Sequence, residues 1–338
     1  LYAMAQGDFN RDGKLDLVFS VDSGVSGNLV FYPGDGAGGF GAPTTSPGVL
    51  GDYPLQPVAA DFTGDGILDL AVPNFFSNTV SLVVGDGAGG FTNVGTLASL
   101  HEPHSAAFGD FDRDGHQDLA VALWGGGTVK IFLGDGAGGF TLKGSYGGYG
   151  GQDRLTSVTA ADCDRDGILD LLVANYGISE MGWGNTVGFM KGNGDGSFAN
   201  ANNYPVGRQP GNICVGDLNR DGLLDFTVTS NLDQWVAVYL GQSDGTFDGA
   251  GTYALPSVGE FYFAALADFN GDDQADLVLT WLTANQVVIL PGNCNGTFAP
   301  ASVVGPDEPV RNLAVGDFDR DGKADIMALG GGLTNVYF

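Results

Sequence analysis

The sequence predicts an all-β fold: a seven-bladed β-propeller of four-stranded antiparallel blades in which the last blade is incomplete. An acidic pattern of nine residues, Asp-x-(Asn/Asp/Thr)-x-Asp-x-x-x-Asp, occurs seven times at intervals of 49 to 55 residues. A glycine-rich turn follows six of the seven copies, and strand-like segments flank both motifs. A period of about 50 residues is typical of repeat architectures, and four-stranded units repeated radially make a propeller.

Four strands, A to D, are expected in each repeat. Strand A leads into the acidic loop, as at 58–60, and strand B leaves it, as at 68–72. Strand C, as at 79–84, leads to the glycine-rich turn, as at 85–91, and strand D leads to the next repeat. The repeat predicts one domain over 1–338 with blades at about 1–50, 51–100, 101–151, 152–206, 207–257, 258–306 and 307–338.

The last repeat differs from the others. The segment 335–338 falls where strand C is expected, and no glycine-rich turn follows it in the sequence. The last blade is therefore expected to lack its fourth strand. An exposed strand edge can pair with another chain, so association through this blade is a possible partner interaction.

The acidic loops, numbered 1 to 7, predict metal binding. Converging carboxylates repel one another by about 1 kcal/mol per pair in water and about 4 kcal/mol at an effective dielectric of 20. Calcium takes six to eight oxygen ligands, and its EF-hand loops use positions 1, 3 and 5 and the carbonyl at position 7. Here the closing acid comes at position 9. The predicted ligands are Asp8, Asn10, Asp12, Lys14, Asp16; Asp61, Thr63, Asp65, Ile67, Asp69; Asp110, Asp112, Asp114, His116, Asp118; Asp162, Asp164, Asp166, Ile168, Asp170; Asp217, Asn219, Asp221, Leu223, Asp225; Asp268, Asn270, Asp272, Gln274, Asp276; and Asp317, Asp319, Asp321, Lys323, Asp325.

Up to seven calcium ions are expected, with loops 2 and 6 the weakest sites. Loop 2 has Thr63 at position 3, and loop 6 has Asp273 where the other loops have the glycine of a sharp bend. The alternative is a set of metal-free turns, because Asp and Asn favour turns in any case. The strand-like flanks exclude helix–loop–helix geometry.

Composition excludes two classes of partner. The chain of 338 residues has a formal charge of −27 and only 13 lysines and arginines, so nucleic acid is not expected to bind. No apolar run reaches 18 residues, so membrane insertion is not expected either. Three cysteines cannot all pair with one another, and Cys163 replaces the usual Phe or Leu at position 2 of its loop, which predicts a small buried hydrophobe.

The acidic loop followed by a Gly-Asp-Gly turn resembles the FG-GAP/VCBS repeat family, and the resemblance covers the whole chain. That family occurs in the propellers of integrin α subunits, in some lectins and in secreted bacterial proteins. The resemblance implies calcium in the A–B loops, held in blade 1 by Asp8, Asn10, Asp12 and Asp16 and in the other blades by the matching positions. Weak multi-site calcium binding suits a secreted or cell-surface protein.

Ligand binding is expected at the other end of the blades. The A–B and C–D turns share one end, whereas the B–C and D–A loops share the other and vary between repeats. Binding residues concentrate in such loops. The candidates are His104, Trp124, Tyr149, Arg154, Tyr176, Glu180, Trp183, Trp235 and Trp281. The alternative is that these aromatic residues pack between blades.

A binding module for a glycan or an extracellular protein is the favoured function, because the variable loops contain no catalytic constellation. One alternative is a polysaccharide lyase or hydratase that uses His101, Glu102, His104, Arg154 and Glu180, although their spacing fits no zinc signature. Another is a rigid domain of a larger cell-surface protein.

Overall fold

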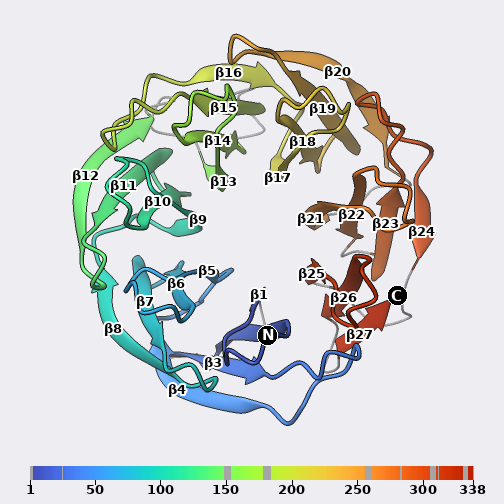
Figure 1. The fold of residues 1–338 in the computed structure, drawn as a ribbon. Helices are drawn as coiled ribbons and strands as arrows, with labels where there is room; N and C mark the ends of the chain where they lie inside the picture. Colours follow the sequence, from blue (N-terminus) through green and yellow to red (C-terminus); the bar gives the residue numbers. More distant parts are fainter. Residues whose placement is uncertain are drawn as a thin grey trace. The chain divides into compact units, whose positions relative to one another are not determined.

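The computed structural model describes residues 3–24, 26–147, 154–177, 184–255, 261–281, 284–304, 310, 312–329 and 334–337, and their regular structure is β-strand (Figure 1). The strands form six four-stranded antiparallel sheets and one three-stranded sheet. The prediction of a seven-bladed propeller is therefore wrong, because only six sheets in the described part of the chain have four strands. The error arose because the seven acidic loops count A–B hairpins, and the seventh hairpin belongs to the three-stranded sheet.

The chain divides into two compact units. Unit 1 comprises Leu1–Val158, Gly192–Ala199 and Asp317–Asp321. Its first three blades each run in the order A-B-C-D. They are blade 1, with β1 (Ala3–Gly7), β2 (Asp16–Asp22), β3 (Gly27–Tyr32) and β4 (Thr44–Leu50); blade 2, with β5 (Val58–Ala60), β6 (Asp69–Asn74), β7 (Thr79–Gly85) and β8 (Phe91–Leu97); and blade 3, with β9 (Pro103–Gly109), β10 (Asp118–Leu123), β11 (Thr128–Gly134) and β12 (Phe140–Gly147).

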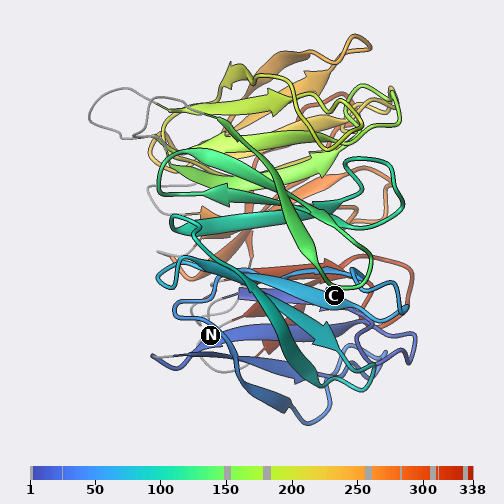
Figure 2. The same ribbon diagram turned by 90° about the vertical axis from the view of Figure 1, so that its left-hand side faces the viewer.

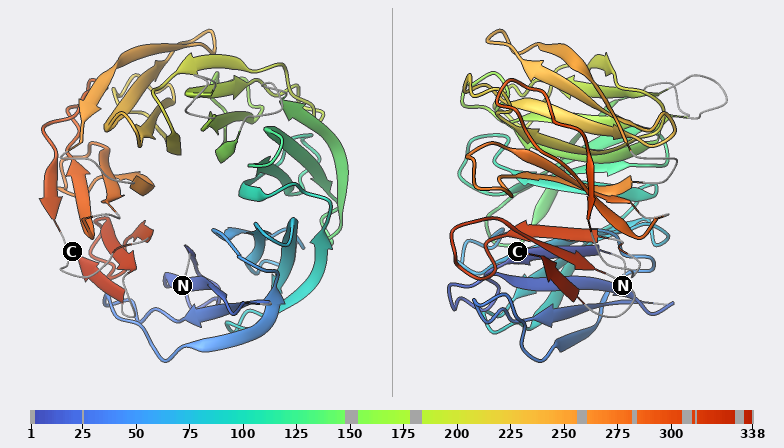
Figure 3. Two further views of the ribbon diagram at one scale, coloured as in Figure 1. Left: turned by 180° about the vertical axis from the view of Figure 1, so that it is seen from behind. Right: turned by 90° about the vertical axis from the view of Figure 1, so that its right-hand side faces the viewer.

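Unit 2 comprises Thr159–Lys191, Asn200–Gly316 and Gly322–Phe338. Figures 2 and 3 show the strands of both units from further sides. The remaining strands are blade 4, with β13 (Leu155–Ala161), β14 (Asp170–Asn175), β15 (Thr186–Met190) and β16 (Asn202–Pro205); blade 5, with β17 (Pro210–Gly216), β18 (Asp225–Ser230), β19 (Trp235–Gly241) and β20 (Phe247–Ala254); blade 6, with β21 (Phe261–Ala267), β22 (Asp276–Trp281), β23 (Gln286–Leu290) and β24 (Ser302–Val304); and the three-stranded sheet of β25 (Asn312–Gly316), β26 (Asp325–Leu329) and β27 (Thr334–Tyr337).

Burial is greatest in the second strand of a blade and least in the fourth, as blades 2 and 3 show. Every residue of the second strand is buried in β6, β10, β14, β18 and β22, whereas β8 and β12 are mostly exposed. After its first aspartate, β10 is accordingly a continuous apolar run, Leu-Ala-Val-Ala-Leu. The buried side chains form hydrophobic clusters that each combine two successive blades, for example β2, β3, β6 and β7 in unit 1.

The ninth aspartate of the acidic loop joins the two turns of one blade. In blade 3, Asp118 is fully buried, and its Oδ2 accepts the N–H of Phe111 at 2.8 Å while its Oδ1 accepts the N–H of Gly134 at 2.8 Å. The same pair of bonds recurs at Asp16, Asp69, Asp225 and Asp276. The A–B loop and the C–D turn therefore share one end of the blade, as predicted.

The second residue of the acidic loop joins successive blades. Phe111 lies in edge-to-face contact with Phe198, which ends the next glycine-rich turn, at a centroid distance of 5.5 Å. Its carbonyl also accepts the N–H of Gly196 at 3.0 Å. Equivalent ring contacts join Phe9 to Phe91, Phe62 to Phe140 and Phe318 to Phe40. In unit 2, Cys163 is buried in one cluster with Phe247, which confirms its prediction as a small core residue.

Candidate metal sites and ligand surface

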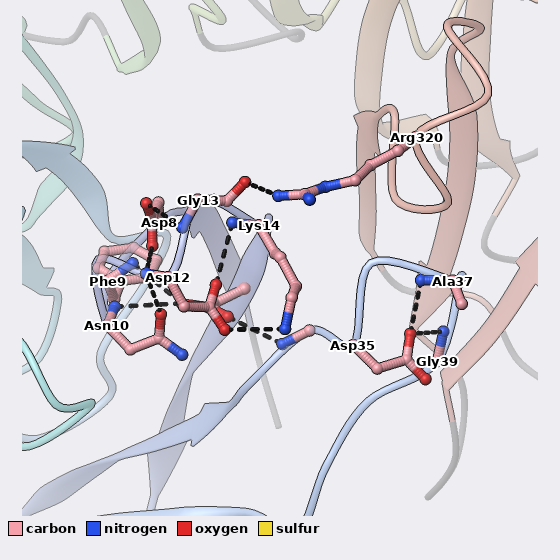
Figure 4. Close-up of polar contacts among 12 residues, drawn as sticks. Asp8, Phe9, Asn10, Asp12, Gly13, Lys14, Asp35, Ala37, Gly39 and Arg320 are labelled. Carbon is pink, nitrogen blue, oxygen red and sulfur yellow. Dashed lines mark hydrogen bonds and ion pairs between the residues drawn. The ribbon is translucent and has the colours of Figure 1, made fainter.

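The backbone of acidic loop 1 wraps around its own polar side chains (Figure 4). Asp8 accepts the N–H groups of Asp12 at 3.0 Å and Gly13 at 2.9 Å. Asp12 in turn accepts the N–H of Lys14 at 3.0 Å. Gly13 has a φ of 78°, so the predicted sharp bend at position 6 is confirmed. The turn that starts at Gly34 closes in the same way, since Asp35 accepts N–H groups from Ala37 and Gly39.

Loop 6 makes the same bend without glycine, as Asp273 has a φ of 60°. An L-residue pays a conformational cost in this left-handed region. Position 4 is also left-handed in the described loops, and five of the seven loops place an arginine there, which sequence reasoning missed: Arg11, Arg113, Arg165, Arg220 and Arg320. Two of these arginines bond to a neighbouring loop. Arg320 donates to the carbonyl of Gly13 (Figure 4), and Arg220 donates to the carbonyl of Asp273.

Three loops gather carboxylate oxygens within 4.8 Å of one another, in each case from positions 1, 3 and 9. They are loops 3, 4 and 7, with Asp110, Asp112 and Asp118; Asp162, Asp164 and Asp170; and Asp317, Asp319 and Asp325. These are the loops that have aspartate at position 3. The predicted ligands at position 5 do not belong to these groups, and one oxygen of Asp114 accepts the N–H of His116 at 2.8 Å.

Two aspartates at position 1 keep a buried oxygen without a hydrogen-bond partner in the described part of the chain. These atoms are Oδ1 of Asp162 and Oδ1 of Asp217, whereas Oδ2 of each accepts the glycine N–H at position 6. A buried, unsatisfied carboxylate oxygen is costly. A cation that takes this oxygen as a ligand removes the cost. A set of oxygen donors alone fits a hard cation such as calcium.

Burial raises the pKa of the ninth aspartate in several loops. For Asp118 the pKa rises to about 6, because desolvation and the negative charges of Asp112 and Asp114 outweigh the hydrogen bonds from Gly134 and Phe111. The pKa values of Asp16, Asp69, Asp225 and Asp276 are raised by desolvation in the same direction. The ionised form is therefore disfavoured at these positions unless a cation lies beside it.

Loop 2 differs in its hydroxyl at position 3. Oγ1 of Thr63 donates to Oδ2 of Asp69 at 3.0 Å, so this side chain bonds the ninth aspartate rather than adding a carboxylate. Because a neutral hydroxyl is a weaker ligand than a carboxylate, loop 2 stays a predicted weak site, as does loop 6.

The opposite end of the unit 1 blades carries a series of ring contacts that we call the aromatic ladder, formed by Tyr53, Phe75, Phe76, His104, Trp124 and Arg154. The ring centroids of Tyr53 and Phe76 lie 4.7 Å apart, and those of Phe75 and Trp124 lie 6.4 Å apart. His104 stacks on Trp124 at 5.4 Å. The Arg154 guanidinium carbon lies 4.9 Å from the centre of the Trp124 ring, within cation–π range. Phe76 is 60% exposed, so the ladder reaches solvent.

Backbone bonds between neighbouring loops hold the aromatic ladder in place. Phe75 N–H donates to the Tyr53 carbonyl at 3.0 Å, and Trp124 N–H donates to the Glu102 carbonyl at 2.9 Å. His104 donates Nδ1–H to the Thr156 carbonyl at 2.8 Å. Burial lowers the pKa of His104, which keeps its ring neutral. These hydrogen bonds restrict the conformations of the loops in the absence of a ligand, which lowers the entropy cost of binding one.

The predicted ligand residues separate into different environments. His104, Trp124 and Arg154 meet in the aromatic ladder, whereas Trp281 is 8% exposed within a core cluster of unit 2. Trp235 donates its indole N–H to the Val206 carbonyl at 3.2 Å, and Tyr176 is half-buried. Tyr149, Glu180 and Trp183 lie outside the described residues.

Sequence reasoning missed Tyr53, Phe75 and Phe76. The adjacent Phe75 and Phe76 directly follow strand β6, as Trp124 follows β10, and this shared place in the repeat is the signal that could have found them. Among the residues of the enzyme hypothesis, the His104 ring nitrogen Nδ1 is engaged by backbone and His101 is exposed.

No helix in the described part of the chain is long and apolar enough to cross a membrane. A search of curated protein sequences finds no match. Among solved structures, the chain is similar to a lectin from Agrocybe aegerita that recognises non-reducing terminal N-acetylglucosamine, with 17% identity, coverage of 99% of this chain and 85% of that one, and a TM-score of 0.63. It is also similar to BBS1N in its complex with ARL6DN, with 12% identity, coverage of 99% and 92%, and a TM-score of 0.67.

A further similar structure is virginiamycin B lyase from Staphylococcus aureus, with 12% identity, coverage of 97% of this chain and 91% of that one, and a TM-score of 0.59. At sequence identities this low, the similarity to these structures shows a shared fold and nothing about function. The model of the FG-GAP-like repeat matches residues 8–72, 118–173, 217–279 and 268–328, which together make up more than half of the chain. The chain therefore belongs to the FG-GAP-like repeat family.

Proposed function

We propose that this β-propeller is an extracellular binding module in which calcium ions stabilise the acidic loops and the aromatic ladder binds carbohydrate. The observation that carries the calcium part is the buried, unpartnered oxygen of Asp217 in loop 5, together with the carboxylates that converge in loops 3 and 7. Calcium would lie among positions 1, 3 and 9, and it would neutralise carboxylates that burial otherwise disfavours.

Thermal unfolding in calcium and in EGTA tests this part. A ligand at 100 times its Kd stabilises the folded state by about 2.7 kcal/mol per site. Several occupied loops are expected to raise the Tm by more than about 10 °C, whereas magnesium at the same concentration should raise it less, because it prefers a rigid octahedral set that includes waters. An equal Tm in calcium and in EGTA would exclude calcium as a stabilising ion.

The proposed extracellular location predicts a weak affinity of the acidic loops for calcium. Extracellular modules bind calcium with Kd values of about 0.1–1 mM, whereas cytosolic sensors bind about a hundredfold more tightly or better. Titration calorimetry should therefore give Kd values above about 10 µM. Values in the nanomolar range would argue for a cytosolic role.

The carbohydrate part is supported by the exposed Phe76 and by the rings aligned beside it. The flat faces of sugar rings carry C–H groups that pack on aromatic rings, and Arg154 supplies hydrogen-bond donors next to Trp124. The similar Agrocybe aegerita lectin recognises a sugar, and its fold is shared by this chain. The lyase alternative has less support, because His104 is engaged by the backbone.

Glycan-array binding of the calcium-loaded protein tests the ladder. Phe76→Ala is expected to weaken binding by about tenfold or more, because hot-spot side chains contribute at least about 2 kcal/mol. Val94→Ala removes another exposed apolar side chain, 55% exposed, outside the ladder and should leave binding unchanged. Equal binding by both variants would exclude the ladder as the carbohydrate site.

A further inference from the structure

Loop 4 contains a cation supplied by the protein itself. The Lys191 ammonium lies 2.9 Å from Oδ2 of Asp166 and also contacts Oδ2 of Asp164. Lys191 comes directly before the glycine-rich turn of its blade. The other five blades have an apolar residue at this place: Pro33, Val84, Leu133, Leu240 and Pro291. Among the six four-stranded blades, only blade 4 thus has a lysine or arginine directly before its glycine-rich turn.

Loop 3 is the natural comparison, because loops 3 and 4 have the same residues at positions 1, 3, 4, 5, 6 and 9. Both gather the carboxylates of positions 1, 3 and 9 within 4.8 Å. In the described part of the chain, no lysine or arginine pairs with the carboxylates of loop 3, whereas Lys191 bridges two carboxylates of loop 4. The two loops therefore differ in their counter-ion rather than in their ligands.

Loop 1 also has a lysine beside its carboxylates, but that lysine does not pair with two of them as Lys191 does in loop 4. Lys14, at position 7 of its own loop, contacts only Asp12, at 3.1 Å. Lys191 comes from outside the acidic loop and contacts two of its carboxylates, and the side chain of Asp164 is only 8% exposed. A charge pair at a buried carboxylate is less screened by water and salt than one at an exposed carboxylate.

We infer that Lys191 competes with calcium for loop 4, because its ammonium holds the Asp164 carboxylate that an ion among positions 1, 3 and 9 would need, so that this loop binds calcium far more weakly than loop 3. An arriving ion must either displace the ammonium from Asp164 and Asp166 or share their oxygens with it at close range, where like charges repel. The inference rests on the proposed calcium binding at the other loops. It adds that loop 4 keeps its shape when calcium is scarce.

Calcium stoichiometry by equilibrium dialysis with elemental analysis, together with titration calorimetry, tests this inference. The variant Lys191→Leu introduces the residue that blade 3 has at this place, Leu133. It should bind one more calcium ion than the wild type, with an affinity at loop 4 at least about tenfold higher. Lys143→Leu removes the same charge near Asp195, from which its ammonium lies 4.0 Å away, and should bind like the wild type. In EGTA, Lys191→Leu should melt below both proteins, and calcium should restore its Tm.

The reverse exchange, Leu133→Lys, brings a lysine to loop 3 and should remove one calcium ion. An unchanged stoichiometry and affinity in Lys191→Leu would overturn the inference while leaving calcium binding intact. If Lys191→Leu does not fold even in calcium, as judged by circular dichroism, Leu133→Lys decides, and an unchanged stoichiometry there overturns the inference. A wild type that binds no calcium would instead refute the proposed function.

Discussion

Strand β10 separates two chemically different ends of blade 3. At its start, the Asp118 carboxylate accepts hydrogen bonds from two backbone N–H groups, and the same pair of bonds recurs in most other blades. Just beyond its end, Trp124 stacks with His104 and Arg154 in a combination found in no other described blade. The first end repeats because the same aspartate joins the same two turns in each of these blades. The second end is free to vary, so it is where a ligand can be distinguished.

The largest effect is expected at the joint between blades. Phe111 is 1% exposed and packs on Phe198, so Phe111→Ala should destabilise the protein by about 3–5 kcal/mol. Urea unfolding in saturating calcium measures the change. Leu142→Ala, at a position 51% exposed, should change stability by less than about 0.5 kcal/mol. A loss below about 1 kcal/mol for Phe111→Ala would mean that the repeated end does not hold the blades together.

A smaller effect is expected when the ninth aspartate is replaced. Asp118→Ala leaves the N–H groups of Phe111 and Gly134 without an acceptor, at about 1–3 kcal/mol each, although it also removes a carboxylate that burial disfavours. A net loss of about 2–4 kcal/mol is expected in EGTA. Asp118→Asn keeps one acceptor oxygen and removes the charge, so it should lose less than the alanine variant.

Calcium separates the two roles of Asp118. Both variants should gain less stability from calcium than the wild type, because a proposed calcium ligand of loop 3 is removed in Asp118→Ala and loses its negative charge in Asp118→Asn. If Asp118→Asn is as unstable in EGTA as Asp118→Ala, the buried charge itself, rather than its acceptor oxygens, holds the loop together.

The repeated end was largely predictable from sequence. The spacing of aspartates identified every acidic loop, and the glycine at position 6 predicted the left-handed bend observed at Gly13. Burial of the ninth aspartate was not predicted, because its partner Gly134 lies 16 residues away and the bond forms only when strands B and C pair. The blade count failed because each acidic loop was counted as one blade, although the seventh loop belongs to a sheet of three strands.

The variable end was only partly predictable. Trp124 and Arg154 were expected to bind ligand, but their stacking depends on residues 30 positions apart that meet through the fold. Trp281 looked equivalent to Trp124 in sequence, yet it lies in the core. The contact of Lys191 with loop 4 could not be predicted from the acidic pattern, because Lys191 lies outside that pattern and meets Asp164 only in the folded blade.

The smallest effect is expected from pH at the variable end. Burial lowers the pKa of His104 below its usual value of 6.5, so the unfolded chain takes up a proton there at a higher pH than the folded protein does. Stability is therefore expected to fall as the pH decreases below about 6.5, by up to about 1.4 kcal/mol per pH unit until the lower folded pKa is reached. Asp118 acts in the opposite direction over part of this range, because its raised pKa favours the folded state at low pH.

Comparison with His104→Phe isolates the histidine, because Asp118 contributes equally to both proteins. The phenylalanine keeps a ring against Trp124 but cannot titrate or donate to the Thr156 carbonyl. Urea unfolding at pH 7.5 and 5.5 should therefore show a smaller loss for the variant than for the wild type. Equal losses would mean that His104 takes up a proton in the folded protein as readily as in the unfolded chain, and the aromatic ladder would then carry a positive charge at mildly acidic pH.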